Sequence, residues 1–139
     1  AFFRTGDAFA VEHIALCGIT AVPPNRDIHK TALGAELTVP WSYYETTEAC
    51  IDRLHADGYE VLAVEQVEGA AMLDALAFDP QARYALVFGN EVDGVGEEGV
   101  DRCDGAVEIP QAGTKHSINV AVSGGVVLWS FFCRIGPGR

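Results

Sequence analysis

The chain has 139 residues, of which 49% are hydrophobic and 21% are charged, and its formal net charge is −11. A chain of this length forms one domain with a sizeable core, and this hydrophobic content excludes intrinsic disorder. It contains no uncharged apolar run of about 18 residues and no signal-peptide pattern, so we expect neither a membrane span nor secretion. The acidic excess, taken alone, argues against binding nucleic acid through bulk charge.

Short apolar runs of strand length alternate with helix-like stretches along the chain. The runs are unbroken rather than alternating, which is typical of strands covered on both faces in a parallel sheet. The predicted strands are residues 14–17, 37–39, 61–64, 85–88 and 106–109. The predicted helices are residues 2–10, 46–56, 70–77 and 117–133. Such alternation places the chain in the α/β class.

Capping signals support the helix boundaries. Thr46 or Thr47 is a suitable N-cap for the second helix, and Gly58 is a suitable stop signal after it. The last segment is long and apolar enough for a buried helix, although residues 126–129 alone would also suit a strand. Residues 22–25 (VPPN) mark a loop rather than a domain boundary.

The four cysteines and four histidines are scattered along the sequence, without a close Cys-x-x-Cys pair. Zinc sites and thioredoxin-like motifs use such close pairs, so we predict no metal site. We expect reduced, mostly buried thiols in a cytosolic protein, which places it in the cytoplasm.

The glycine-rich residues 94–99 match the spacing of a dinucleotide-binding loop, but their chemistry argues against that function. Glu97 and Glu98 stand where a pyrophosphate would meet amide donors at the start of a helix. No acidic residue follows at the spacing of about 20 residues that usually holds a ribose. A calcium loop would place Gly89 at its first ligand position, and residues 121–125 (AVSGG) lack the first glycine of a hydrolase nucleophile elbow.

The overlapping segment, residues 88–95, is a better candidate for ligand binding. A strand ends in glycine, a polar pair follows, and a second glycine comes shortly after. Such backbone permits close approach of a ligand at the carboxyl edge of a parallel sheet. The alternative interpretation is a plain turn with a solvated acidic rim.

Three segments form an ordered set that covers nearly the whole chain. They are residues 4–9 (RTGDAF), residues 86–94 (LVFGNEVDG), and residues 109–113 (IPQAG) with 117–122 (SINVAV). In this order and spacing they resemble the three motifs of the SpoU/TrmH RNA 2′-O-ribose methyltransferases, in the trefoil-knotted SPOUT superfamily. Residues 23–35 resemble the linker of that family. The first motif lacks its opening Asn and Gly and the strand before them, so we expect the domain to lack its first strand.

The resemblance implies one SPOUT domain over residues 1–139, with an α/β fold. Its sheet would be mostly parallel, with helices on both faces and a C-terminal trefoil knot. S-adenosylmethionine would be the cofactor, and a ribose 2′-hydroxyl of tRNA or rRNA would accept the methyl group. Apolar walls with a few backbone hydrogen bonds suit a purine. The residues expected around the adenosine are Val87, Phe88, Gly89, Ile109, Pro110, Ile118 and Ala121.

The catalytic residues that the resemblance implies are Arg4, Asn90, Glu91, Ser117 and Asn119. A charged guanidinium has no lone pair, so we favour a role for Arg4 in holding the ribose or phosphate and stabilising the developing alkoxide. Glu91 would hold Arg4 in a bidentate ion pair. The structural alternatives are that Ser117 and Asn119 cap a helix and that Arg4 lies on a helix surface.

The resemblance also implies a homodimer that uses the C-terminal helix. Trp129, Phe131 and Phe132 cluster there and suit an interface, although a helix buried within one chain is the alternative. RNA is the expected partner, with no DNA and no membrane. Two other functional hypotheses compete with this one. The first is a catalytically silent knotted module that binds RNA or cofactor, and the second is a generic doubly wound nucleotide-binding domain.

The distribution of charge weakens the objection to an RNA partner. Residues 45–68 and residues 91–108 each carry seven acidic residues and one basic residue. Residues 109–139 carry three basic residues and no acidic residue, and together with residues 1–44 they sum to +2. The ends that carry the first and third motifs are therefore neutral to basic, and we expect modest, salt-sensitive RNA affinity.

Overall fold

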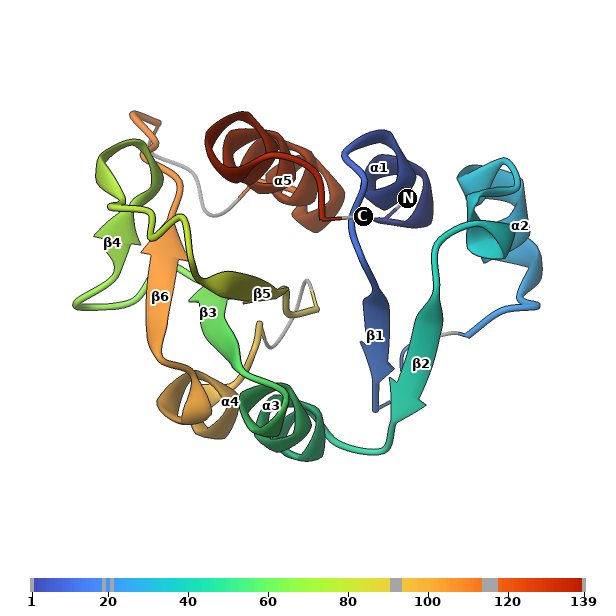
Figure 1. Ribbon diagram of the computed structural model, residues 1–139, viewed down its shortest axis with the longest axis horizontal. Coiled ribbons are helices and arrows are strands. Elements are labelled where there is room, and N and C mark those ends of the chain that lie inside the picture. Colours follow the sequence, from blue (N-terminus) through green and yellow to red (C-terminus); the bar gives the residue numbers. More distant parts are fainter. Residues whose placement is uncertain (1, 19, 21, 91–93, 114–117, 139) are drawn as a thin grey trace. The chain divides into compact units, whose positions relative to one another are not determined.

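The computed structural model describes residues 2–18, 20, 22–90, 94–113 and 118–138 (Figure 1). The chain divides into two compact units, one formed by Ala1–Cys50 with Gly124–Arg139 and the other by Ile51–Ser123. The elements in chain order are α1 (Phe2–Ala8), β1 (Ile14–Cys17), α2 (Arg26–Ala32), the 3-10 helix η1 (Ala35–Leu37), β2 (Trp41–Tyr44), α3 (Thr47–Ala56), β3 (Tyr59–Val64), β4 (Ala71–Met72), the 3-10 helix η2 (Leu73–Ala75), β5 (Arg83–Val87), α4 (Glu97–Arg102), β6 (Gly105–Glu108) and α5 (Val120–Ile135).

Each unit contains one parallel sheet. In the first unit β1 pairs with β2, and Ile14 lies opposite Trp41. In the second unit the strand order is β4-β6-β3-β5, and Ala63 of β3 pairs with Val87 of β5 on one side and with Ala106 of β6 on the other. Every described ladder between these strands is parallel, which confirms the predicted α/β class with a mostly parallel sheet.

Each unit has its own apolar core. In the second unit the unbroken apolar strand β3 is central, and Val61 and Ala63 are fully buried together with Val107 of β6. In the first unit α1, α2 and η1 pack together. The buried residues of that cluster are Phe3, Leu16, Ala32, Ala35 and Val39.

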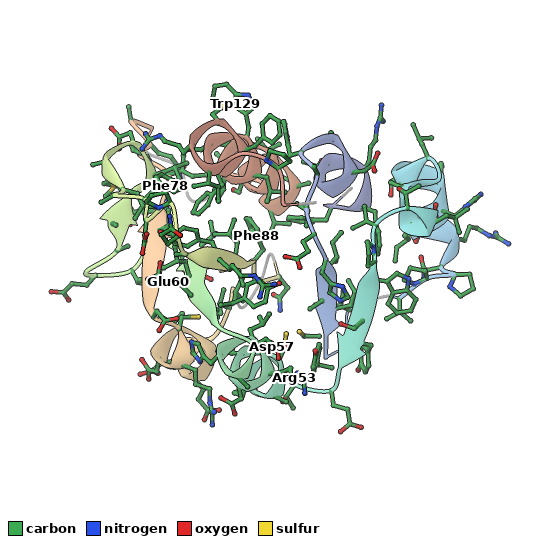
Figure 2. All side chains as sticks on the ribbon, in the orientation of Figure 1. Arg53, Asp57, Glu60, Phe78, Phe88 and Trp129 are labelled. Atoms are coloured by element: carbon green, nitrogen blue, oxygen red, sulfur yellow. The ribbon has the colours of Figure 1, made fainter. Side chains whose placement is uncertain are left out.

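Helix α5 confirms the predicted C-terminal helix and excludes the strand alternative for residues 126–129. Val127 and Phe131 are buried, and the ring of Phe132 lies 5.8 Å from that of Phe9, centroid to centroid. Trp129 is 57% exposed and projects outward from α5 (Figure 2). No helix in the described part of the chain is long and apolar enough to span a membrane.

The predicted strand over residues 37–39 is wrong. Residues 35–37 form η1 and the strand of this region begins at Trp41. Gly34, with φ of +90°, turns the chain at the start of η1, and Leu37 is 84% exposed rather than buried in a sheet. A run this short carries too little periodicity to separate a strand from a helical turn.

The predicted helix over residues 70–77 is also wrong. Ala71 and Met72 form the short strand β4, which pairs with Val107 and Glu108 of β6, and η2 follows it. Hydrogen bonds to a neighbouring strand outweigh helix propensity, which is a weak local preference. Only the tertiary fold brings β6 to this segment.

Polar side chains and a glycine set the helix ends. The hydroxyl oxygen of Thr46 accepts a hydrogen bond from the Ala49 amide at 3.1 Å, and Gly58 follows α3 with φ of +88°, as predicted. Helix α2 was not predicted, because it lies in the linker segment. Asn25 caps it, since its side-chain oxygen accepts from the Asp27 amide at 2.9 Å.

All four cysteines are free, in keeping with the expected reduced thiols. Cys50 is buried and Cys17 and Cys103 are half-buried, but Cys133 is exposed, so the expectation of mostly buried thiols is wrong there. In the first unit a hydrogen bond between the Cys17 and Cys50 thiols lowers the pKa of Cys17 and raises that of Cys50. Burial raises the pKa of Cys103 to about 11.

Asp104 links three elements of the second unit. Its carboxylate accepts a hydrogen bond from the Val61 amide of β3 at 2.7 Å, and it lies 2.8 Å from Nε2 of His55 on α3. Its own amide donates to the Val61 carbonyl, just before β6 begins. The hydrogen bond from Val61, and then the one with His55, hold the pKa of Asp104 below its ordinary value.

We expect Asp104→Asn to lower stability at neutral pH and to match the natural protein in acid. A carboxylate with a depressed folded pKa stabilises the fold above its unfolded pKa of about 3.9, and this contribution disappears as pH falls through the folded pKa. Urea unfolding at a series of pH values measures the difference. Asp101→Asn, at an exposed position of α4, is the control, and an equal loss in both variants would contradict the prediction.

Adjacent glycines of α5 give a second prediction. A Cβ at Gly124 would lie 2.5 Å from Cε1 of Phe2, whereas a Cβ at Gly125 would meet nothing within 4 Å. We expect Gly125→Ala to stabilise by up to about 1 kcal/mol through helix propensity, and Gly124→Ala to destabilise by about 1–2 kcal/mol because Phe2 must move. In a Phe2→Ala background the penalty at Gly124 should vanish, which thermal unfolding of the double variant checks.

Candidate active site

The carboxyl ends of three neighbouring strands define one edge of the second unit. Because β6, β3 and β5 are parallel, the residues that follow them leave the sheet at the same edge. Adjacent strands lie about 4.8 Å apart, so these segments are close neighbours. Phe88 and Gly89 follow β5, Ile109 and Pro110 follow β6, and Glu65 follows β3. Figure 2 labels the Phe88 side chain near β5.

The glycines of the loop after β5 are required by close backbone packing. A Cβ at Gly89 would lie 1.9 Å from the carbonyl carbon of Gly94 and 2.2 Å from the amide nitrogen of Val95. Gly94 itself has φ of +65°, and its amide donates to the Asn90 carbonyl at 3.1 Å. The structure places Gly89 against the backbone of its own loop, and that it also approaches a ligand stays a prediction.

Glu65 binds the C-terminal part of this loop, at Val95. Its Oε1 atom accepts a hydrogen bond from the Val95 amide at 2.6 Å. Its own amide donates to the Val107 carbonyl of β6 at 3.1 Å, which fixes the residue at the sheet edge. Glu65 was not predicted as a site residue, although a charged residue directly after a buried strand is a signal for one.

The start of α5 holds three of the predicted site residues. The side-chain oxygen of Asn119 accepts from the amides of Ala121, at 2.8 Å, and Val122, at 3.4 Å. Asn119 is therefore a helix N-cap, and the structural alternative stated for it is confirmed. Ile118 and Ala121 on either side of it are half-buried.

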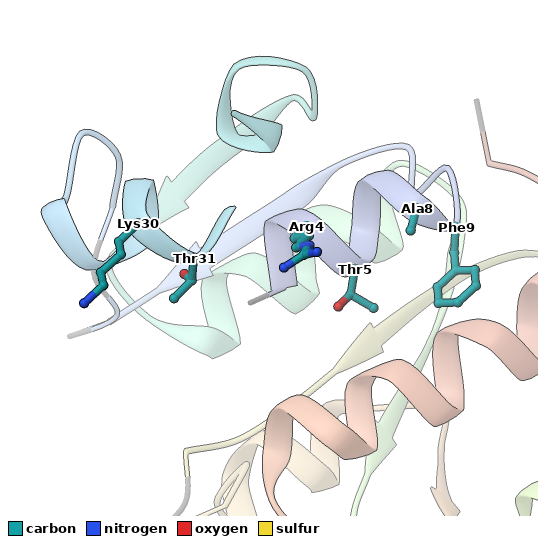
Figure 3. A pocket seen from close by; sticks show the side chains of 6 residues that line it. All are labelled: Arg4, Thr5, Ala8, Phe9, Lys30 and Thr31. Carbon is teal, nitrogen blue, oxygen red and sulfur yellow. The ribbon is translucent and has the colours of Figure 1, made fainter. Parts of the chain in front are cut away.

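In the first unit, Arg4 lines a hollow between α1 and α2. The hollow has a volume of about 660 Å³ and is largely open to solvent. Figure 3 shows Arg4 and Thr5 along α1, Phe9 beyond its end, and Lys30 with Thr31 on α2. Arg4 and Lys30 are both exposed, and neither forms an ion pair with any residue that the structure describes.

Lys30 and Thr31 were not predicted as site residues. They lie in the segment that resembles the family linker, where a lysine followed by a threonine is a weak signal. Arg4 is on an exposed helix surface, as its structural alternative stated, and it also lines a hollow that carries a second cation. Two exposed cations and the Thr5 hydroxyl suit a phosphate group.

The remaining predicted catalytic residues are not brought together by what the structure describes. Glu91 and Ser117 lie outside the described residues. Arg4 belongs to the first unit, and Asn90 and Asn119 belong to the second. That these side chains meet at one site stays a prediction. In the described part of the chain, no three His, Cys, Asp or Glu side chains gather in an arrangement that would hold a metal ion.

The parallel sheets place this chain among the α/β domains, a class in which ligands bind at the carboxyl ends of the strands. Comparison with known proteins gives the family. The model of the SpoU rRNA Methylase family matches residues 1–129, and the chain therefore belongs to that family.

Relatives and solved structures agree with this assignment. A tRNA (guanosine(18)-2′-O)-methyltransferase of Borreliella burgdorferi is 29% identical over 103 residues, which cover 74% of this chain and 46% of that protein. A 23S rRNA (guanosine-2′-O-)-methyltransferase RlmB of Neisseria meningitidis is 32% identical over 128 residues, which cover 92% of this chain and 50% of that protein. The AdoMet-bound rRNA methyltransferase structure from Sinorhizobium meliloti superposes with a TM-score of 0.87 at 27% identity, over 96% of this chain and 50% of that one. The chain thus spans half or less of each of these relatives.

We expect Gly89→Ala to open the loop after β5. The new Cβ would collide with the backbone of Gly94 and Val95, and backbone cannot yield as a side-chain tip can. Faster hydrogen exchange at the Val95 amide and a loss of about 1–3 kcal/mol in stability are the expected results. Gly125→Ala is the control, and unchanged exchange at Val95 in Gly89→Ala would contradict the packing argument.

Proposed function

We propose that this protein transfers the methyl group of S-adenosylmethionine to a ribose 2′-hydroxyl of tRNA or rRNA. The observation that carries the proposal is the close packing of Gly89 against Gly94 and Val95 at the carboxyl edge of a parallel sheet, in a chain whose residues 1–129 match the family. Relatives named as tRNA and rRNA (guanosine-2′-O-)-methyltransferases support the acceptor, and the AdoMet-bound neighbour supports the cofactor.

The segments that leave β5 and β6, with the start of α5, would hold the adenosine. Most of these residues are half-buried, and they offer apolar walls beside backbone donors and acceptors, which fits a purine. When bound, S-adenosylmethionine supplies an electrophilic methyl group on a sulfonium. The residues proposed to hold it are Val87, Phe88, Gly89, Ile109, Pro110, Ile118 and Ala121.

Arg4 and the hollow between α1 and α2 would hold the RNA. The Arg4 guanidinium would clamp the ribose or its phosphate and stabilise the negative charge that develops on the 2′-oxygen as its proton leaves. Lys30, on the facing helix, would bind a neighbouring phosphate of the same strand. This arrangement lets a chain of net charge −11 bind RNA through a local pair of cations.

The other polar residues would position the acceptor. Glu91 would hold Arg4 in a bidentate ion pair, and Asn90 and Ser117 would orient the ribose. The side-chain oxygen of Asn119 is engaged by helix amides, so its amide hydrogens are the groups that would donate to the ribose.

The assembly around this site is part of the same proposal. We propose a single knotted domain of the SPOUT type, acting as a homodimer in the cytoplasm. Exposed apolar side chains at helical spacing on α5 support dimerisation, namely Val122, Val126 and Trp129.

The test is transfer of labelled methyl from S-adenosylmethionine to total tRNA and rRNA by the full-length protein. We expect Arg4→Ala to lower kcat roughly 100-fold or more, because an interaction made with developing charge is lost. Full activity in Arg4→Ala would overturn the proposed role. Cofactor binding without transfer to any RNA would instead favour the catalytically silent binding module.

Lys30 gives a separate prediction about RNA affinity. Lys30→Ala should raise the KM for RNA with little change in kcat, and it should reduce the slope of log affinity against log salt by about 0.7–0.9, the loss of one phosphate contact. Arg26→Ala, an exposed position that begins the same helix, is the matched control. Equal salt slopes for Lys30→Ala and the natural protein would exclude a phosphate contact at Lys30.

A further inference from the structure

Glu65 connects β3, β6 and the loop after β5. It directly follows β3, its amide donates to the Val107 carbonyl of β6 at 3.1 Å, and its carboxylate accepts from Val95 in the loop after β5 at 2.6 Å. The side chain is half-buried. One residue therefore ties the loop after β5 to the neighbouring strands, and it does so at the edge where the cofactor is proposed to bind.

The loop is built to receive this carboxylate. A Cβ at Gly94 would lie 2.3 Å from Oε1 of Glu65, so any larger residue there would displace the carboxylate. Gly94 also needs glycine for its φ of +65°. A charged acceptor makes a stronger hydrogen bond to a backbone amide than a neutral acceptor does, so an ionised Glu65 suits the Val95 amide well.

The hydrogen bond between Glu65 and Val95 also restrains the backbone around Gly89. The backbone at Gly94 and Val95 packs directly against Gly89, within a distance that excludes a Cβ. Any shift of Val95 away from Glu65 therefore frees Gly89 and the adjoining Phe88 to change conformation. Both belong to the segment proposed to contact the adenosine.

We infer that Glu65 is a positioning residue that sets the affinity for S-adenosylmethionine by holding Gly94 and Val95 against Gly89. It acts through the loop backbone rather than by contact with the methyl group or the ribose. The inference rests on the proposed function, because it assumes that the cofactor binds at this edge. Its effect falls on cofactor affinity, and the turnover rate at saturating cofactor should change little.

The experiment compares Glu65→Ala, Glu65→Gln and the control Glu68→Ala in the full-length protein. Glu68 is exposed and lies three residues further on, so Glu68→Ala removes the same charge without removing the Val95 contact. We expect Glu65→Ala to weaken binding of S-adenosylhomocysteine, measured by calorimetry, by roughly 10- to 100-fold, the equivalent of one charge-assisted hydrogen bond. Glu65→Gln keeps an acceptor oxygen and should recover most of the affinity, and Glu68→Ala should bind normally.

Hydrogen exchange at the Val95 amide distinguishes loss of the Glu65–Val95 hydrogen bond from a general loss of stability. We expect faster exchange at Val95 in Glu65→Ala, under conditions where the amides of β3 stay protected. If Glu65→Ala does not fold, Glu65→Asp takes its place, since its shorter side chain should not reach Val95 and should bind the probe several-fold more weakly.

The outcomes distinguish the two levels of the proposal. If the natural protein binds no S-adenosylhomocysteine, the proposed function fails. If it binds and Glu65→Ala or Glu65→Asp binds equally well, the proposed function stands and the role of Glu65 is overturned. Equal losses in Glu65→Gln and Glu65→Ala would also overturn it, because the acceptor oxygen would then not be what matters.

Discussion

Parallel pairing of β3 between β5 and β6 is the constraint on which the candidate cofactor site depends. Ala63 faces Val87 on one side and Ala106 on the other, so three chain segments leave the sheet at the same edge. The buried apolar residues of β3 stabilise this pairing, and Asp104 adds a charged hydrogen bond at the opposite end of the strand. Loops that are distant in sequence therefore become neighbours, which is how parallel α/β sheets build ligand sites.

The glycine loop shows why a sequence motif needs its chemistry examined. Residues 94–99 have the spacing of a dinucleotide fingerprint, yet the acids within them have a structural explanation, because Glu97 and Glu98 occupy the first turn of α4, where negative charge stabilises a helix. The glycines that matter are Gly89 and Gly94. Gly89 lets two segments of the loop backbone pack against each other, and Gly94 leaves room for the carboxylate of Glu65. The loop is thus specified by its own packing before any ligand binds.

For the proposed RNA binding, the distribution of charge matters more than the net charge. Arg4 and Lys30 line one hollow of the first unit, although the chain as a whole carries −11. Surface cations act over a Debye length of about 8 Å at physiological salt, so such a local pair is felt by a bound phosphate even in an acidic protein. Total charge is therefore a guide to the strength and salt sensitivity of RNA binding, and a poor guide to the class of partner.

By itself the sequence determined the α/β class, the strands β1, β3, β5 and β6, the helices α1, α3 and α5, and the family, because buried strands and ordered motifs are local patterns. The tertiary structure alone decided that residues 71–72 form a strand, since only the neighbouring β6 offers them hydrogen bonds. It also decided that Glu65 accepts a hydrogen bond from Val95 and that Arg4 and Lys30 line the same hollow, since these residues are far apart in sequence. A single sequence records which residues suit burial or a turn, but contacts between distant segments exist only once the chain has folded.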